Sequence, residues 1–383
     1  MYRESQPIAE GAPFFDFSFT RLAHRDIRLR FSDQERVELG FCIQNAWEML
    51  RQDQGYKTAE VVALTADNFS WGKYPDGEAY ALSTAQARDR LQIERKQHTR
   101  LYAAGNLEDS DDVLAAQTIL DSLHNPQTIL ATMYFPYERG DRPEIRPDGK
   151  QELLLLQTLV ENLKNSNVKG LIHINPHSPV FPWYCLQEGI APLSLSALPR
   201  LIREAQQVGL LQDTDFVTAN GDDGAKSSRQ LLTQCLGCNE SVNGIKHKID
   251  GKTIVTYSPE DLEKVYGKTV IFTEDIISTG GTMMASILQL LNEGHAKQVI
   301  ILATYPIFAG SALERLGFDS RVKIITTDGR TPLTDIRKSE NITIVPMKDS
   351  LTNVLELDKQ GMNFWSQKGK ESLDTLGFCL FPW

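Results

Sequence analysis

The sequence contains no long uninterrupted apolar stretch. The apolar run Leu153–Leu156, for example, ends at Gln157 and lies in a helical pattern, whereas a membrane-spanning helix needs about 20 apolar residues. The N-terminal residues Met-Tyr-Arg-Glu-Ser-Gln-Pro also lack the apolar core of a signal peptide. We therefore expect a cytoplasmic protein without a membrane partner.

Cysteine is scarce, and positive charge is not in excess. Of five cysteines only Cys235 and Cys238 form a C-x-x-C pair, and no second pair completes a zinc site. We interpret this pair as two small residues near a helix end. A formal net charge of −10 argues against general nucleic-acid binding, because phosphate backbones need a basic surface. A nucleotide substrate needs only a few local cations and stays possible.

What the chain does contain is a regular alternation of strand and helix patterns. Its 383 residues, of which 41% are hydrophobic, are enough for two domains of ordinary size. Such alternation predicts an α/β protein with two mainly parallel sheets flanked by helices. The expected strands are Val61–Leu64, Thr128–Tyr134, Val168–Ile174, Asp215–Ala219, Thr269–Phe272 and Gln298–Thr304. The first expected helix opens at the capping box Ser32–Glu35 and runs through Val37, Phe41, Ala46 and Leu50. The other expected helices are 111–123, 150–164, 197–207, 227–236 and 282–292.

The most informative segment is Thr269–Thr282. An apolar strand ends in Glu274 and Asp275, a Ser-Thr-Gly-Gly-Thr turn follows, and a helix begins whose Met284, Ile287, Leu288 and Leu291 share one face. A turn of this kind directs backbone N–H groups at one point before a helix N-terminus, which favours a phosphate. The two acids can hold ribose hydroxyls or a metal ion. The segment therefore predicts a pentose phosphate site.

Five further segments follow expected strands or lie in loops, where ligands of open α/β sheets bind. Each alone has an ordinary reading as a turn, a structural histidine or a solvated basic run. The acids Asp222 and Asp223 suit a hydrated Mg²⁺ ion. The segments are Lys73–Glu78, Tyr134–Asp141, His173–His177, Asn220–Lys226 and Gly244–Lys248.

Together and in this order, the segments resemble the ribose-phosphate pyrophosphokinase (phosphoribosyl pyrophosphate synthetase) family from about Val61 to Leu355. The resemblance implies two type I phosphoribosyltransferase-like domains. The N-terminal domain would comprise residues 1–190 with the ATP-side loops, the C-terminal domain 191–345, and a C-terminal extension 346–383. The family also implies MgATP as co-substrate and a homo-oligomer with shared active sites.

On the ATP side, the resemblance implies roles for five residues. Tyr74, Asp76 and Glu78 would lie over the adenine, contributed by a neighbouring subunit. Arg139 would contact the ATP phosphates, and His177 would lie beside the phosphates and the metal.

On the ribose side, the resemblance assigns the remaining charged residues. Asp222 and Asp223 would be metal-site acids, Lys246 the catalytic lysine, and Lys248 a second cation in the place of a family arginine. These lysines, with Arg139 and Mg²⁺, would stabilise the charge that develops during diphosphoryl transfer. The ribose phosphate would be held by Glu274, Asp275, Ser278, Thr279, Gly280, Gly281 and Thr282.

The sequence also departs from the family pattern at several of these positions. Lys248 loses the bidentate fork of an arginine, and the other differences are Gly140, Asn175, Pro176, Glu274 and Ser278. The longer N-terminus, an expected exposed excursion over 86–100 and the C-terminal tail are additions. The acceptor is therefore left open between ribose 5-phosphate, taken as the default, and ADP-ribose, which carries the same phosphate ester and would yield ADP-ribose 1-pyrophosphate for NAD⁺ reconstitution, as in phage-type relatives.

Two other functions share part of these features. A phosphoribosyltransferase has the same phosphate turn but no use for an adenine loop and a lysine pair. A non-catalytic regulatory homologue is opposed by Lys246, His177 and Asp222, because charged groups that are costly to hold together should be lost once catalysis is lost.

Overall fold

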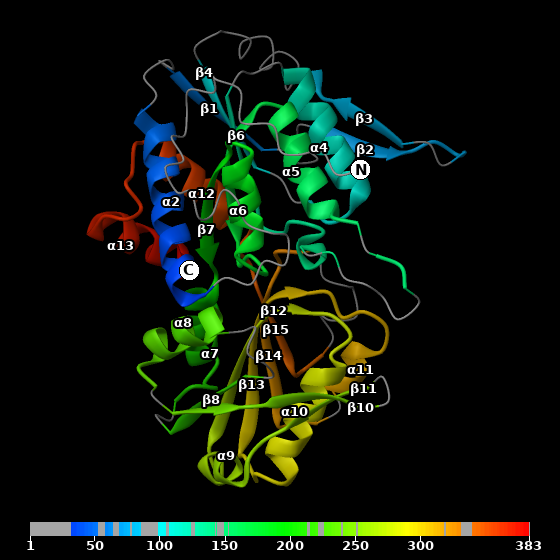
Figure 1. Ribbon diagram of the computed structural model, residues 1–383, viewed down its shortest axis with the longest axis vertical. Coiled ribbons are helices and arrows are strands. Elements are labelled where there is room, and N and C mark those ends of the chain that lie inside the picture. The colour runs from blue at the N-terminus through cyan, green and yellow to red at the C-terminus, as the bar shows by residue number, and fades with distance from the viewer. Residues whose placement is uncertain are drawn as a thin grey trace. The chain divides into compact units, whose positions relative to one another are not determined.

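Figure 1 shows the structure of the chain as a computed structural model. It describes residues 32–52, 58–63, 69–76, 79–85, 99–104, 107–123, 127–141, 143, 149–151, 153–212, 215–220, 226–238, 240–249, 252–317, 319–330 and 339–382. These form two compact units, the first from the described residues up to 194 with 355–363, the second from 195–354 with 364–382. The domain limits expected at 190 and 345 remain predictions. Among the described helices, none is both long and apolar enough to cross a bilayer.

The first unit is built on a mainly parallel sheet. Strands β1 (Thr58–Ala63), β4 (Thr99–Ala104), β5 (Thr128–Thr132) and β6 (Val168–Ile174) pair in parallel in this order. Strand β7 (Ala191–Ser196) comes next in the sheet, and its last two residues pair antiparallel with β16 (Cys379–Leu380). The helices of this unit are α2 (Asp33–Gln52), α4 (Ser110–Leu123), η1 (Glu138–Gly140), α5 (Leu155–Asn165) and α6 (Val180–Gln187).

Helix α2 confirms the predicted capping box and the helix that follows it. Ser32 Oγ donates to Glu35 Oε2 over 2.6 Å, and the Glu35 amide donates back to Ser32 Oγ over 3.3 Å. Val37 and Phe41 lie on the outer side of this helix, where they are 52% and 60% exposed. A second stripe is buried instead, because β6 has Gly170 at the contact and lets large side chains approach its backbone. A Cβ on Gly170 would lie only 2.7 Å from Leu50 Cδ2 and 3.3 Å from Trp47 Cζ3.

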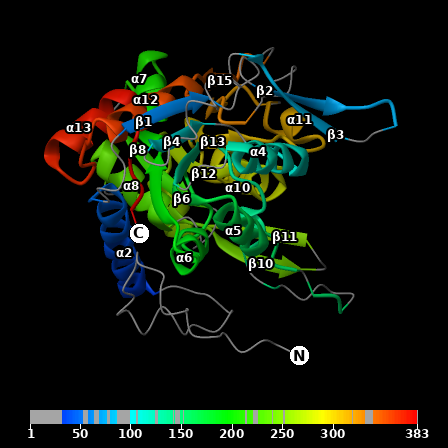
Figure 2. The same ribbon diagram turned by 90° about the horizontal axis from the view of Figure 1, so that it is seen from above.

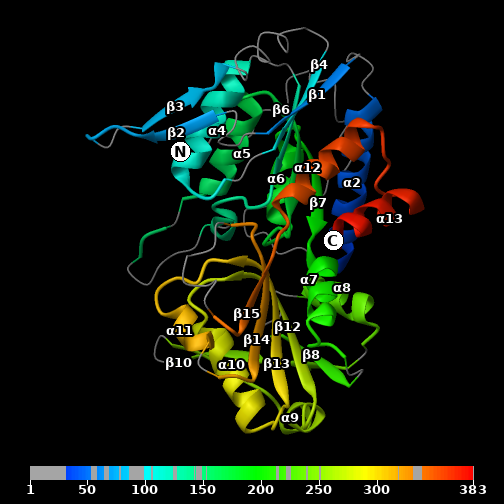
Figure 3. The same cartoon turned by 180° about the vertical axis from the view of Figure 1, so that it is seen from behind.

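A buried carboxylate joins α2, β4 and α12 (Lys348–Lys359) inside the first unit. Asp358 accepts hydrogen bonds from Trp47 Nε1 at 3.1 Å and Tyr102 Oη at 2.9 Å, and Arg51 Nε lies 3.6 Å away. Burial raises the pKa of this carboxyl, and the Tyr102 and Trp47 hydrogen bonds oppose the rise. Figure 3 shows α12 beside α2. Of the segment expected to be a C-terminal extension, residues 355–363 belong to the first unit, and Asp358 is buried in it.

The expected exposed excursion over 86–100 is only partly visible. Residues 86–98 lie outside the described part of the chain, but Thr99 and Arg100 belong to β4. Exposure was wrongly predicted for Arg100, which is 8% exposed. Its guanidinium donates to Gln127 Oε1 at 2.6 Å and to the Leu50 carbonyl at 2.5 Å, so its charge is compensated by polar partners.

The second unit has a parallel sheet with helices on both sides. Figures 1 and 2 show α7 and α8 on one side and α10 and α11 on the other. The sheet order is β15 (Ile342–Val345), β14 (Val322–Thr327), β13 (Gln298–Pro306), β12 (Thr269–Ile277), β8 (Phe216–Asn220) and β9 (Ser241–Asn243), all parallel. The helices are α7 (Leu198–Gln207), α8 (Lys226–Leu236), α9 (Pro259–Lys264), α10 (Gly281–Asn292), α11 (Ala312–Gly317) and α13 (Gln367–Leu376).

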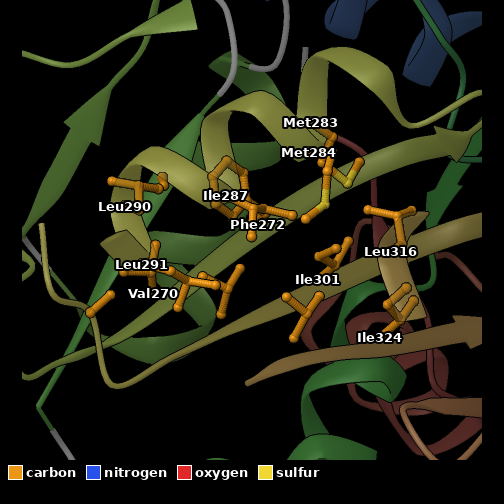
Figure 4. Packing of buried hydrophobic residues seen from close by; sticks show 14 of the residues in the cluster. Val270, Phe272, Met283, Met284, Ile287, Leu290, Leu291, Ile301, Leu316 and Ile324 are labelled. Carbon is orange, nitrogen blue, oxygen red and sulfur yellow. The ribbon is translucent and has the colours of Figure 1, made fainter. Parts of the chain in front are cut away.

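The core of the second unit forms where α10 packs on the sheet. The predicted positions Met284, Ile287 and Leu291 are buried, and Leu288 is partly buried against the same cluster. Figure 4 shows Met284, Ile287 and Leu291 on the side of α10 that faces β12 and the strands beyond it. Apolar packing fixes both β12 and α10. The turn that joins them is therefore fixed at both of its ends.

Candidate active site

The turn between β12 and α10 has the geometry expected of a phosphate-binding loop. Strand β12 continues through Ile277, so Glu274 and Asp275 occupy its last residues rather than a loop after it. Glu274 pairs with Ala303 of β13 in the sheet register, and Asp275 Oδ1 accepts from the Ile276 amide at 2.8 Å. Both acids are half-buried. They therefore sit on regular backbone immediately before the turn.

The turn itself is anchored on one side and open on the other. The amides of Phe308 and Ala309 donate to the carbonyls of Ile277 and Ser278 at 2.9 and 3.1 Å. Ser278 and Gly280 are half-exposed and Thr279 and Gly281 are exposed. Gly280 has φ 66° and ψ 3°, a left-handed conformation, and α10 starts at the next residue. The backbone thus presents the first turn of a 12-residue helix to an exposed surface, which is a favourable place for an anion.

In the first unit, hydrogen bonds join the loop after β5 to the loop after β6. The loop after β5 contributes Glu138, whose Oε2 accepts from the His177 amide at 2.6 Å. It also contributes Asp141, whose Oδ2 accepts from Ser178 Oγ at 2.5 Å. The loop after β6 begins at Asn175, which has φ 43°. Two buried acids therefore hold one loop against the other.

The hydrogen bond between Glu138 and His177 places two predicted site residues near each other. Arg139 follows Glu138 in the short helix η1, and His177 carries the amide that Glu138 accepts from. Both Arg139 and His177 are exposed, while Glu138 is 7% exposed. Backbone hydrogen bonds to carboxylates are among the stronger ones. The Arg139 and His177 side chains are therefore exposed to solvent on backbone that the Glu138 hydrogen bond holds in place.

The other histidine of this segment has a structural environment. His173 in β6 is 1% exposed, and its Nε2 lies 2.7 Å from Ser194 Oγ. Phe181 meets its ring edge-on with centroids 4.5 Å apart. Burial lowers the pKa of His173 to about 3. The ring is therefore neutral in the folded protein, and His177 is the histidine of this segment that solvent or a ligand can reach.

The adenine-loop prediction falls on the tip of a hairpin. Strand β2 (Phe69–Lys73) pairs antiparallel with β3 (Ala79–Ser83), and the segment predicted from Lys73 onward begins at the end of β2. Tyr74 and Asp76 are exposed in the turn, and the Tyr74 ring lies 4.8 Å from that of Tyr80 between centroids. Glu78 lies outside the described residues.

The two predicted catalytic lysines occupy a strand rather than a loop. Lys246 and Lys248 belong to β10 (Ile245–Ile249), which pairs antiparallel with β11 (Lys252–Thr256). Lys246 is opposite Val255 and Lys248 is opposite Thr253 in the register. The polar-loop prediction was wrong here because β11 supplies backbone partners. The sheet order places this hairpin apart from the six-stranded sheet.

The predicted metal acids cannot be placed. Asp222 and Asp223 lie outside the described residues. Within the part of the chain that is described, no group of three His, Cys, Asp or Glu residues is arranged to hold a metal ion. Mg²⁺ takes oxygen ligands, which favours the aspartates over the His177 imidazole as direct ligands.

Sequence reasoning missed the residues that position the loops of the first unit. Glu138, Asp141 and Ser178 were not selected, because acids in a polar loop are usually solvated and only the fold reveals that they are buried. The C-x-x-C pair lies near a helix end, as predicted: Cys235 is exposed in α8, and Cys238 is buried just after this helix.

Comparisons with known proteins agree on one family. A ribose-phosphate pyrophosphokinase of Aquifex aeolicus is 29% identical over 205 residues, which span 53% of this chain and 62% of the relative. Those of Sulfurisphaera tokodaii and Sulfolobus acidocaldarius are 28% and 29% identical over 261 and 234 residues, spanning 83% and 75% of the relatives. In sequence, the chain is similar to the ribose-phosphate pyrophosphokinase family. None of the protein-family models matches it.

The solved structures confirm the predicted fold class. The phosphoribosylpyrophosphate synthetase of Mycobacterium smegmatis superimposes with a TM-score of 0.62 at 18% identity, covering 80% of this chain and all of the other. At this identity the likeness concerns the fold. The similarity to the ribose-phosphate pyrophosphokinases rests on the sequence relatives.

Proposed function

We propose that the protein transfers the β,γ-diphosphoryl group of MgATP to the anomeric C1 hydroxyl of a 5-phosphorylated ribose. The C1 oxygen attacks the β-phosphorus, the bond from that phosphorus to the oxygen bridging it to the α-phosphorus breaks, and AMP leaves. The C1 hydroxyl loses its proton. Ribose 5-phosphate is the default acceptor. ADP-ribose, with the same phosphate ester and a free C1 hydroxyl, is the alternative.

The observation that carries this proposal is the β12–α10 turn. Two half-buried acids end the strand, a left-handed Gly280 reverses the chain, and the exposed start of α10 follows. Carboxylates suit the ribose diol, and the helix start suits the ester phosphate. Phosphate and diol sites a few residues apart match a pentose phosphate, and the sequence relatives are named for a ribose phosphate.

The roles of the remaining residues belong to the same proposal. Arg139 and His177 would bind the ATP phosphates, and the exposed Tyr74 and Asp76 would hold adenine, with Glu78, from a neighbouring subunit. Lys246 and Lys248 would stabilise the charge on the transferred group. Mg²⁺ enters as part of the MgATP substrate, with Asp222 and Asp223 as its predicted protein contacts.

The test is to incubate the protein with MgATP and either acceptor, and to quantify AMP, ADP and the sugar product. We expect AMP and a 1-diphosphorylated sugar from at least one acceptor. The Lys246→Ala variant should lower kcat by at least about 100-fold, because it removes a cation from the transferring group, while Lys264→Ala on α9 should not. Sedimentation of the same preparation should show an oligomer.

Three results would contradict the proposal. ADP as the product would show transfer of one phosphoryl group instead of two. Activity that requires a free base and a diphosphorylated sugar would indicate a phosphoribosyltransferase. No turnover with either acceptor would indicate a non-catalytic homologue. Full activity of Lys246→Ala would remove this lysine from the mechanism while leaving the reaction itself intact.

A further inference from the structure

Helix α11 lies directly against the phosphate turn and contributes a residue to which no role has been assigned. A Cβ built on Gly280 would lie 3.0 Å from Leu316 Cδ1, and a Cβ built on Gly281 would lie 3.9 Å from Arg315 Nη1. Leu316 is fully buried and Arg315 is exposed. The same helix therefore closes the underside of the turn with an apolar side chain and places a guanidinium at its open edge.

This guanidinium has no acid to neutralise it among the described residues. Asp319, four residues further along, accepts from Arg321 at both carboxylate oxygens, over 3.1 and 2.7 Å. No hydrogen bond or ion pair joins the Arg315 side chain to any residue in the described part of the chain. The acid that the local sequence offers is thus engaged elsewhere.

The position of Arg315 is also electrostatically unfavourable on its own. The N-terminus of a helix carries partial positive charge from its aligned peptide dipoles, so a cation placed there is repelled. Arg315 Nη1 lies beside Gly281, the first residue of α10. An anion bound at the turn would convert this repulsion into attraction, because it would be shared by the helix start and the guanidinium.

We propose that Arg315 is a phosphate-anchoring residue for the acceptor, contacting the 5-phosphate ester that the turn receives. This inference rests on the proposed function for the identity of the acceptor. The contact between the Arg315 guanidinium and a sugar 5-phosphoryl group at the start of α10 can be tested without turnover. Because the ester phosphate is common to ribose 5-phosphate and ADP-ribose, Arg315 should serve both acceptors equally.

The experiment measures binding of ribose 5-phosphate and ADP-ribose by calorimetry to the wild type and to Arg315→Gln and Arg315→Lys. The control is Lys264→Gln, which removes the same charge at the other end of α10. Leu262, two residues before Lys264, lies 3.3 Å from a Cβ built on Gly294, just after the helix ends. The steady-state rate of AMP formation is then measured to separate kcat from the KM of each substrate.

We expect Arg315→Gln to weaken the binding of both acceptors by the same factor, about tenfold or more, because a charge-assisted hydrogen bond is lost. The acceptor affinity of Arg315→Lys should lie between those of the wild type and Arg315→Gln, because lysine keeps the charge but lacks the planar fork of the guanidinium. The acceptor KM should rise in parallel, while the ATP KM, and kcat at saturating acceptor, change by less than about threefold. Lys264→Gln should match the wild type.

Several outcomes would overturn the assignment. Unchanged acceptor binding in Arg315→Gln would do so, as would a loss no larger than that in Lys264→Gln. A loss confined to ADP-ribose would mean that Arg315 contacts a different phosphate. A fall in kcat with unchanged binding would make its role indirect. If the wild type binds ribose 5-phosphate without forming AMP, the proposed reaction fails while the binding comparison still decides the role of Arg315.

Discussion

The phosphate turn makes a sharp prediction about two adjacent glycines. Gly280 has φ 66°, and a Cβ there would lie 3.0 Å from Leu316 Cδ1, which is fully buried and cannot move freely. Gly281 has ordinary helical geometry at the start of α10, and its nearest new contact would be at 3.9 Å. The two positions therefore differ in conformation and in space, although the sequence presents them as equivalent.

For Gly280→Ala, the left-handed backbone alone costs about 1–2 kcal/mol. The tight contact with Leu316 adds to this cost, because the leucine must shift inside a packed core. For Gly281→Ala, the helical position costs nothing and gains up to about 1 kcal/mol by restricting the unfolded chain. The expected difference between the two variants is about 2 kcal/mol in the free energy of unfolding.

Urea unfolding of both variants, followed by far-UV circular dichroism, measures this difference at constant m-value. Gly280→Ala should also raise the KM for the acceptor, because the turn must distort to accept the methyl group. Equal stabilities of the two variants would refute the reasoning, since both the backbone angle and the contact distance would then be without consequence.

Two further predictions concern the first unit. Asp358→Ala should destabilise the protein by about 2–6 kcal/mol in urea unfolding, because the buried donors of Trp47 and Tyr102 lose their acceptor. Asp358→Asn should cost less, and a loss below about 1 kcal/mol for the alanine variant would contradict the network. Burial lowers the pKa of His173 to about 3 in the folded protein, whereas its pKa in the unfolded chain is near 6.5. Its contribution to folding stability is therefore fully present above pH 6.5 and is lost as the pH falls towards 3. The stability advantage of the wild type over His173→Gln should therefore shrink by about 1.4 kcal/mol per pH unit below pH 6, and a constant advantage would contradict a neutral buried ring.

Some elements could not be predicted because their signal is not periodic. Residues Val180–Leu186 of α6 are all buried, so the helix shows no polar face that would reveal its period. The hairpins β2–β3 and β10–β11 were interpreted as turn and loop, since each strand depends on a partner that local sequence does not identify. Strand β4 was hidden for the same reason at the end of a polar segment.

The sequence by itself determined the parts of this protein that depend on neighbours in the chain. The capping box of α2, the apolar face of α10 and the acid–turn–helix order of the phosphate loop all follow from spacing, because hydrogen bonds and packing at three or four residues are local.

The tertiary structure decided everything that joins distant segments. Glu138 reaches the amide of His177 across 39 residues, and Asp358 reaches Trp47 across 311. Arg315 reaches the edge of the phosphate turn only because α11 packs against Gly280. A buried acid and a solvated acid are the same residue type in the sequence. The free-energy cost of each depends on its burial, and burial is decided only when the chain folds.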